Sequence, residues 1–236
     1  MKPIASILLV LATIQICHAE EKSIRVFVAL CDNASQGIVP VPQRIGNGDQ
    51  PDANLYWGCT EGLKAFFRAS RQWKLEKREI PRDQVVLERL EFKHVSGDAT
   101  LVAEAYRGSN IRDCLVAFEK SVESDQYHLV AYIGHNGLMD FELPQPGKMK
   151  RGKSDSVVLC CKSETFFRRR LEKLGARPVL LTTQLMYPGS FILHDVIEKW
   201  LDGANREQLR IAAARSYARN QRLSLKAATG VFAELP

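Results

Sequence analysis

Short apolar runs alternate with amphipathic stretches along most of the chain. The runs carry apolar side chains at successive positions, which is typical of strands buried on both faces of a sheet. They cover residues 23–30, 127–133, 156–161 and 177–183. The stretches between and after them place apolar residues three and four positions apart, which predicts helices. The clearest of these cover residues 58–70, 110–123, 163–174 and 191–201.

Two further segments, "DQVVLERLEF" at 83–92 and "ATLVAEAY" at 99–106, flank the turn "SGD" and predict two strands, or one strand packed beside an irregular excursion. Strands that alternate with helices predict a mostly parallel sheet with helices on both faces. We therefore expect an α/β fold, a three-layer αβα sandwich, formed as a single domain by residues 20–236. A segment rich in Gly, Pro, Asn and Asp follows the first strand, at 31–57, and predicts a long irregular loop.

Individual residues at the ends of these elements allow local predictions. Asn110 and Ser163 are expected to cap the helices that begin there, and Gly175 is expected to end the second helix in the left-handed conformation. Successive side chains of a strand point to opposite faces of the sheet. Cys160 is therefore expected in the core, on the face opposite to Cys161.

Residues 1–19 have the pattern of a secretory signal peptide. Lys2 precedes an apolar run from Ile4 to Ile16, and "CHA" precedes Glu20. About thirteen apolar-rich residues are too few to span a bilayer as a mature helix. We expect cleavage near Glu20 and an exported product, periplasmic or secreted. A buried amphipathic helix or an uncleaved anchor is the alternative.

Charge narrows the range of partners. The formal net charge is +6 at pH 7, but the basic residues are scattered apart from three successive arginines at 168–170. A basic stripe interleaved with aromatic residues, as nucleic-acid binding favours, is missing from the sequence. We therefore expect no nucleic-acid partner, and no membrane span once the signal peptide is removed.

Five cysteines follow the signal peptide, at residues 31, 59, 114, 160 and 161. An odd number in an exported protein leaves at least one thiol unpaired within the chain. Cys31 and Cys59 lie at the two ends of the long loop, where a disulfide is an alternative to two free thiols. The sequence has no CxxC and no paired Cys and His spacing of the zinc-binding kind, so we expect neither a metal nor another cofactor.

Two apolar strands end at side chains that suit nucleophilic catalysis. "LVAYIGHNG" places His135 just after one strand, and "VVLCCKS" places Cys161 at the end of the next. Ligands bind beyond the carboxyl ends of parallel strands, so neighbouring strands would bring both residues to one edge. A thiolate attacks a carbonyl carbon while an imidazole transfers protons, and the amino end of the following helix favours the thiolate. Two buried structural residues are the alternative.

The boxes "YIGHNG" and "VVLCCKSE" resemble those of the clan CD cysteine peptidases, which include caspases, legumains, gingipains and clostripain. Members have an α/β sandwich with a histidine after one apolar strand and a cysteine after the next. The resemblance implies a caspase-like fold with His135 as general base and Cys161 as nucleophile. It covers the order of elements from about residue 23 to 200, and its sequence content is confined to the two boxes.

The sequence departs from this family pattern at two points. Asn136 separates His135 from Gly137, whereas family members usually have glycine directly after the histidine and use its N–H to hold the oxyanion. On the resemblance, the N–H groups of Asn136 and Gly137 would serve as the oxyanion donors. Family members often have a glycine shortly after the nucleophile, whereas this chain has Lys162 and Glu164 there.

Three more polar residues near strand ends are candidates for the site. Asp32 and Asn33 follow the first strand and are expected to line a substrate pocket, where an acidic group would favour Lys or Arg before the scissile bond. Asp140 lies close enough to His135 in sequence to orient its imidazole. Loop aspartates also serve simply to cap turns, and that alternative stays open.

Two functions from different classes remain open. The first is an exported cysteine endopeptidase, or a related amidase or transpeptidase, that uses His135 and Cys161 on a peptide or protein substrate. The second is a non-catalytic peptidase-like module that binds a peptide or protein partner at the same edge of the sheet. Thiol reactivity separates them, because a working dyad makes Cys161 far more reactive than free cysteine.

Overall fold

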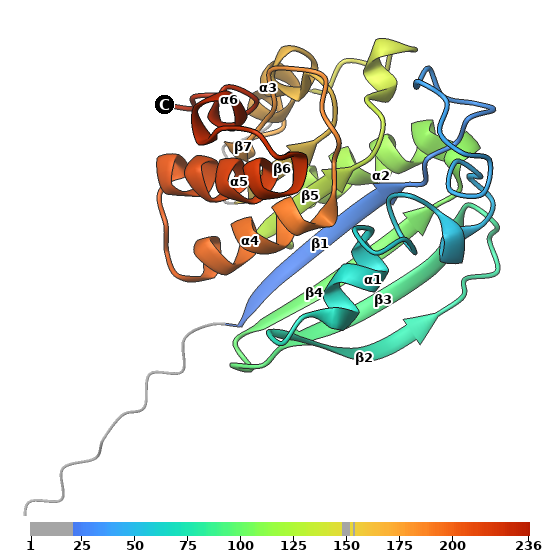
Figure 1. Cartoon of the computed structure of the whole chain (residues 1–236), viewed down its shortest axis with the longest axis horizontal. Helices are drawn as coiled ribbons and strands as arrows, with labels where there is room; N and C mark the ends of the chain where they lie inside the picture. The colour runs from blue at the N-terminus through green and yellow to red at the C-terminus, as the bar shows by residue number, and fades with distance from the viewer. Residues whose placement is uncertain (1–20, 148–151, 153) are drawn as a thin grey trace, which may run out of the picture.

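A computed structural model describes residues 21–147, 152 and 154–236 of the protein (Figure 1). Seven strands form one sheet in the order β2-β3-β4-β1-β5-β6-β7. They are β1 (Lys22–Ala29), β2 (Trp73–Glu79), β3 (Val86–His94), β4 (Ala99–Tyr106), β5 (Leu129–Ile133), β6 (Asp155–Leu159) and β7 (Arg177–Leu180). The pairings from β4 through β1, β5 and β6 to β7 are parallel, and the pairings of β3 with β2 and β4 are antiparallel. The predicted α/β fold with a mostly parallel sheet is confirmed.

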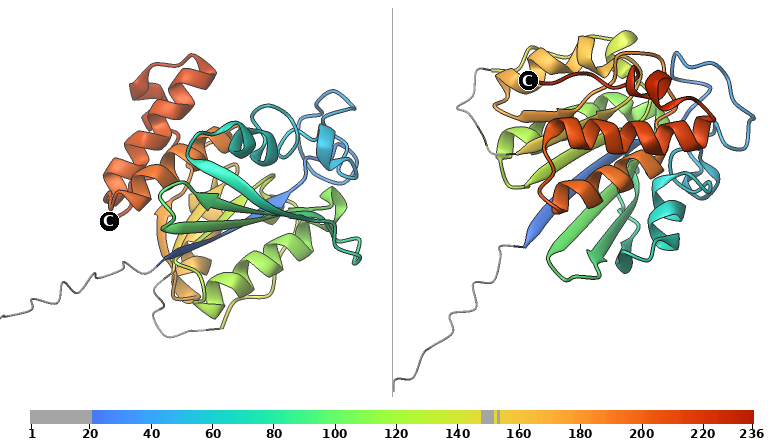
Figure 2. Two further views of the ribbon diagram at one scale, coloured as in Figure 1. Left: turned by 90° about the horizontal axis from the view of Figure 1, so that it is seen from below. Right: turned by 60° about the vertical axis from the view of Figure 1, so that its left-hand side comes forward.

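Helices cover both faces of this sheet and complete the predicted three-layer sandwich (Figure 2). One face packs against α2 (Ile111–Ser124) and α3 (Ser163–Lys173), and the other against α1 (Leu63–Ala69), α4 (Ser190–Leu201), α5 (Arg206–Gln221) and α6 (Leu225–Thr229). The pleat separates the two cores. Ala131 and Ile133 of β5 belong to the core with α4, whereas Val130 and Tyr132 belong to the core with α2.

The strand β2 is an element that the apolar pattern did not predict. Its sequence "WKLEKRE" buries one side chain, Trp73. β2 lies at the edge of the sheet and pairs with β3 alone, so backbone hydrogen bonds rather than apolar side chains define it. A strand of this kind gives no hydrophobic signal in the sequence.

The start and end of α3 test the local predictions. Gly175 has φ +81°, so its predicted left-handed conformation is confirmed. The predicted capping role of Ser163 is wrong, because Lys162 occupies the N-cap position with φ +51°. The buried Ser163 hydroxyl instead donates to the Val158 carbonyl at 2.8 Å and accepts from the Thr182 N–H at 2.8 Å. It therefore ties the start of α3 to the neighbouring strand ends.

The start of α2 shows a similar difference. Asn110 closes the short 3-10 helix η2 (Gly108–Asn110) and directly precedes α2, as predicted. Its side chain makes no cap bond to the helix backbone, and its Nδ2 donates to Asp113 Oδ2 at 2.7 Å. The predicted position of Asn110 before the helix is confirmed, and the predicted capping hydrogen bond is wrong.

The long loop after β1 is irregular, as predicted, apart from the short helix η1 (Pro51–Ala53). Buried polar groups anchor it. Asn54 Oδ1 accepts from the Cys31 N–H at 3.0 Å, and its Nδ2 donates to the Cys31 carbonyl at 2.8 Å. Further along, Glu88 of β3 accepts from the Trp57 indole and pairs with Lys64 at 2.8 Å. These contacts hold the loop in place beside the sheet.

Each edge of the sheet is protected. The edge strand β2 carries exposed charged side chains, among them Lys74 and Glu76. At the other edge the C-terminal segment returns beside the residues after β7, where Thr182 and Phe232 form an antiparallel bridge. The Ala233 N–H also donates to the Leu181 carbonyl at 2.9 Å.

The predicted signal peptide, residues 1–19, lies outside the described residues. Residues 148–151 and 153 lie outside them too. Among the helices of the described ranges, none has both the length and the apolar character needed to cross a membrane.

Candidate active site

Three adjacent strands end together at the carboxyl edge of the sheet. The parallel pairing sets Ile133 of β5 opposite Leu159 of β6, and β1 pairs with β5 on the other side. Cys31, His135 and Cys161 each lie two residues past the end of one of these strands. Equal spacing past neighbouring parallel strands brings the three side chains to the same part of the edge.

These three residues line one cavity of about 510 Å³. Its walls come from the loop after β1, the turn after β5 and the loop after β7. Most of the other lining residues are apolar. These other lining residues are Gly37, Ile38, Val39, Val41, Leu55, Tyr56, Gly134, Met139, Leu185, Met186, Tyr187 and Pro188. The structure therefore brings His135 and Cys161 into one cleft, as the sequence predicted.

His135 is 7% exposed and is held through both its ring and its backbone. Its Nε2 lies 2.7 Å from Asp140 Oδ2. A carboxylate only accepts hydrogen bonds, so Nε2 is the donor of this contact. Nδ1 makes no hydrogen bond among the described residues, and in the neutral imidazole it is the nitrogen that can act as a base. From the opposite core, the Tyr132 hydroxyl donates to the His135 carbonyl at 2.7 Å.

Gly134 makes the turn that delivers His135 to the cavity. Its φ of +154° lies in a region that side-chain-bearing residues rarely adopt. A Cβ at this position would lie 2.9 Å from the Tyr132 hydroxyl oxygen and 3.0 Å from the Ala29 carbonyl oxygen. The close approach of β1, β5 and the turn therefore requires glycine.

Asp140 connects the histidine to the loop after β1. Its Oδ2 accepts from the Gly37 N–H at 3.1 Å as well as from His135. A Cβ on Gly37 would lie 2.6 Å from Asp140 Oδ1, so the loop packs directly on the carboxylate. The same carboxylate thus fixes the imidazole and one wall of the cavity.

Cys161 is partly exposed, and its sulfur contacts the backbone of the loop after β7. The Met186 N–H donates to Sγ at 3.4 Å, and Sγ lies 3.6 Å from the Met186 carbonyl oxygen. Only Lys162 separates Cys161 from the amino end of α3. The Met186 backbone therefore fixes the position of the sulfur at the cavity, close to the start of α3.

Asn136 holds the two strand ends together. Its Nδ2 donates to the Cys161 carbonyl at 2.6 Å, and its Oδ1 accepts from the Leu138 N–H at 3.1 Å. The side chain is fully buried, so it does not crowd the cavity. It couples the turn that carries the base to the turn that carries the nucleophile.

The two expected oxyanion donors differ in their hydrogen bonding. The Gly137 N–H donates to the His135 carbonyl at 3.1 Å. Gly137 is the first residue of the short helix η3 (Gly137–Met139). The Asn136 N–H makes no hydrogen bond to any other residue in the described part of the chain. Neither residue lines the cavity, whereas Gly134 and His135 do.

His135 and Cys161 share no hydrogen bond among the described residues. Base and nucleophile are often further apart before a substrate binds, and contacts of this type tighten in the complex. Both side chains line the same cavity, which leaves room for a substrate group between them.

Cys160 lies on the other face of the sheet, as predicted from the strand pleat. It is fully buried in the core with α2 and α3, and its carbonyl accepts from the Thr182 hydroxyl. Burial raises the pKa of the Cys160 thiol well above its usual value. This thiol stays protonated at neutral pH and is packed away from the cavity.

Asp32 and Asn33 are not brought to the cavity. Asp32 accepts hydrogen bonds from the Ala34 N–H at 3.2 Å and the Ser35 hydroxyl at 2.5 Å. Asn33 forms a reciprocal pair with the Val41 backbone at 2.7 and 3.0 Å. Both residues line a separate hollow and hold turns of the long loop. The structure therefore matches the turn-capping alternative.

Cys31 and Cys59 are free thiols, and no disulfide joins them. Cys31 lines the cavity beside Tyr56. Burial raises the pKa of the Cys31 thiol to about 11 and also raises the pKa of Cys59. Cys31 is thus a neutral part of the cavity wall at physiological pH.

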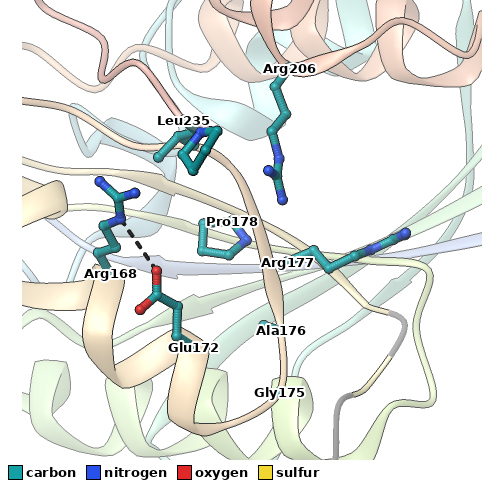
Figure 3. A pocket seen from close by; sticks show the side chains of 9 residues that line it. Arg168, Glu172, Gly175, Ala176, Arg177, Pro178, Arg206 and Leu235 are labelled. Carbon is teal, nitrogen blue, oxygen red and sulfur yellow. Dashed lines mark hydrogen bonds and ion pairs between the residues drawn. The ribbon is translucent and has the colours of Figure 1, made fainter.

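A second hollow, of about 340 Å³, lies at the amino end of β7, away from the edge that carries Cys161 (Figure 3). Two of the arginines that line it are paired with carboxylates, Arg168 with Glu172 at 3.3 Å and Arg177 with Asp155 at 3.0 Å. No nucleophile or histidine lines it. Within the described ranges, no group of three or more His, Cys, Asp and Glu side chains is arranged to hold a metal ion.

The sequence alone did not identify three residues that shape the site. Tyr132 sits in an apolar run, where its hydroxyl gives no signal. Asn54 lies in the irregular loop far from the strand that it braces, and Met186 acts through its backbone alone. Only the folded structure relates these residues to Cys31, His135 and Cys161.

Comparison of the chain with models of protein families, with curated proteins and with solved structures found no match.

Proposed function

We propose that the protein is a cysteine hydrolase that cleaves amide bonds in peptides, with Cys161 as nucleophile and His135 as general base. One observation carries the proposal. The thiol and an imidazole oriented by Asp140 follow adjacent parallel strands and line the same cavity. A nucleophile, a base that takes its proton and a carboxylate that orients the base form a catalytic triad of the kind that transfers acyl groups.

The groups present suffice for a balanced reaction. His135 Nδ1 takes the thiol proton, and Cys161 Sγ bonds to the carbonyl carbon while the π electrons move to oxygen. The intermediate expels the amine, which takes the proton from the imidazolium, and a thioester remains. Water then loses a proton to Nδ1 and attacks the thioester carbon. The second intermediate releases the acid and expels the Cys161 thiolate, which takes the proton back from the imidazolium.

Two features support a relation to the clan CD peptidases. The sheet order places the histidine strand beside the cysteine strand, and the cysteine precedes a helix that starts at once. The signal-like first residues support an exported, periplasmic or secreted, enzyme acting on a peptide or protein substrate. Mass measurement of the exported product tests this part, and an intact Met1 on an unexported product would overturn it.

Active-site labelling tests the catalytic proposal. We expect a peptidyl chloromethyl ketone to alkylate Cys161 near pH 7.5 much faster than it alkylates free cysteine, and fluorogenic peptides to be hydrolysed. The Cys161→Ala variant should lose both properties. Labelling no faster than that of free cysteine, with no hydrolysis of any peptide in a varied panel, would overturn the proposal.

A non-catalytic role has one observation in its favour. The Cys161 sulfur is held by the Met186 backbone and makes no hydrogen bond to His135 among the described residues. A module of this kind would bind a peptide or protein partner in the same cavity without hydrolysing it. Peptide binding that is unchanged in Cys161→Ala, combined with absent hydrolysis, would favour this function.

A further inference from the structure

The mouth of the cavity gathers exposed apolar side chains. Val39 is 87% exposed, Leu185 is 66% exposed and Met139 is 43% exposed. They belong to three separate segments, the loop after β1, the loop after β7 and η3, yet all three line this one cavity. Single exposed apolar residues are common, but a group converging on a cavity indicates a surface that is covered by a ligand.

The interior of the cavity is also apolar and uncharged. Ile38, Val41 and Leu55 form part of the wall, and among the described residues no Asp, Glu, Lys or Arg lines the cavity. Burial raises the pKa of Tyr56 and Tyr187, which keeps both phenols neutral. A charged group entering this space would lose its hydration, and the carboxylate that contacts the wall, that of Asp140, already accepts from His135 and the Gly37 N–H.

The position of the cavity relates this surface to the reacting bond. Cys161 lines the same space as Val39, Met139 and Leu185, so a peptide whose carbonyl reaches Sγ places a neighbouring side chain there. A volume of about 510 Å³ falls in the range of pockets that enclose small ligands. It accommodates a large aliphatic or aromatic side chain.

We infer that the residue preceding the bond attacked by Cys161 carries a large uncharged apolar side chain such as Leu, Met or Phe. This inference rests on the proposed hydrolase function and extends it to the substrate class. It replaces the expectation of a Lys or Arg substrate, since Asp32 lies outside the cavity. Asp and Glu are disfavoured by the same absence of a charged partner.

A panel of fluorogenic peptides that differ only in the residue before the cleaved bond tests the inference. We expect kcat/KM for Leu or Phe to exceed that for Lys, Arg or Asp by at least about 100-fold, because a buried unpaired charge is costly. Faster cleavage after a charged residue would overturn the inference and leave the hydrolase proposal standing.

Two exposed valines provide a matched pair of variants. Val39→Glu introduces a charge at the mouth of the cavity, whereas Val95→Glu introduces one at a site that is 65% exposed and outside the cavity. We expect Val39→Glu to lower kcat/KM for the Leu peptide by about tenfold or more and Val95→Glu to leave it unchanged. Equal effects of the two variants would contradict the inference.

Binding to Cys161→Ala separates the inference from the proposed function. Calorimetry with blocked Leu, Lys and Asp peptides measures affinity without turnover. Tighter binding of the Leu peptide, without hydrolysis by the wild-type protein, would support the apolar site and overturn the hydrolase proposal. Equal affinity for all three peptides would overturn the inference.

Discussion

Nε2 of His135 lies 2.7 Å from Oδ2 of Asp140, and the same oxygen accepts the Gly37 N–H at 3.1 Å. The carboxylate therefore holds the imidazole in one tautomer, with the proton on Nε2 and the lone pair on Nδ1. Asp140 acts on the reaction through His135, so it is a positioning residue.

Replacing this carboxylate should impair catalysis while preserving the fold. Asp140→Asn presents an amide that can donate to Nε2 and so favours the wrong tautomer. We expect kcat to fall by about 10²–10⁴-fold, with a change in the pH profile of kcat and little change in Tm. Asp202→Asn, at the far end of α4, is the control for loss of an exposed carboxylate. Equal activity of wild type and Asp140→Asn would contradict the role of Asp140.

The adjacent cysteines provide an internal control for the nucleophile. Cys161→Ala removes the partly exposed thiol of the cavity, and we expect hydrolysis to disappear with little loss of stability. Cys160→Ala removes a fully buried thiol from the core with α2 and α3, and we expect activity to persist with a loss of about 1 kcal/mol in the free energy of unfolding. Peptide assays and urea unfolding measure the two quantities. The reverse pattern would assign the chemistry to Cys160.

Gly134 should tolerate no side chain. Gly134→Ala places a Cβ within 3.0 Å of the Tyr132 hydroxyl and the Ala29 carbonyl at a backbone φ of +154°. We expect a loss of about 1–3 kcal/mol in the free energy of unfolding and a displaced His135. Gly147→Ala is the matched control, because no atom of the described residues lies within 4 Å of a Cβ built there. Unfolding in urea compares the two variants, and equal stabilities would refute the requirement for glycine.

Stability should depend on pH through Cys31. Burial raises the pKa of this thiol to about 11, above the value of about 8.5 for an unfolded chain, so the neutral thiol favours the folded state. That stabilisation is complete below about pH 8.5 and is lost as pH rises toward about 11. We expect the free energy of unfolding to fall less steeply in this window for Cys31→Ala, by up to about 1.4 kcal/mol per pH unit. Parallel slopes for both proteins would contradict the assigned shift.

Four of the strands that the sequence predicted have two covered faces, whereas the predicted strand β3 buries alternate side chains. β1, β5, β6 and β7 lie between helical layers, and their apolar side chains at successive positions follow from that burial. β2 escaped prediction because an edge strand needs few apolar residues. The hydrophobic pattern therefore indicates which side chains are buried. It predicts a strand only where the strand also buries apolar side chains.

The candidate site divides along a similar line. His135 and Cys161 were predictable because parallel strands carry the residues after them to a shared edge, a relation that depends on topology alone. Asp32 and Asn33 follow a strand of the same edge, but hydrogen bonds to Ser35 and Val41 turn both side chains into the loop. The spacing of residues along the chain does not predict hydrogen bonds of this kind within a turn.

The C-terminal segment that bridges Thr182 to Phe232 has a consequence for solubility. It occupies backbone groups just past the end of β7, at Leu181 and Thr182, and β2 presents charged side chains at the far edge, which opposes pairing with another chain there. Deleting residues 231–236 would uncover the border near β7. Such a truncated protein would be prone to strand-to-strand aggregation, even though the deletion leaves His135 and Cys161 untouched.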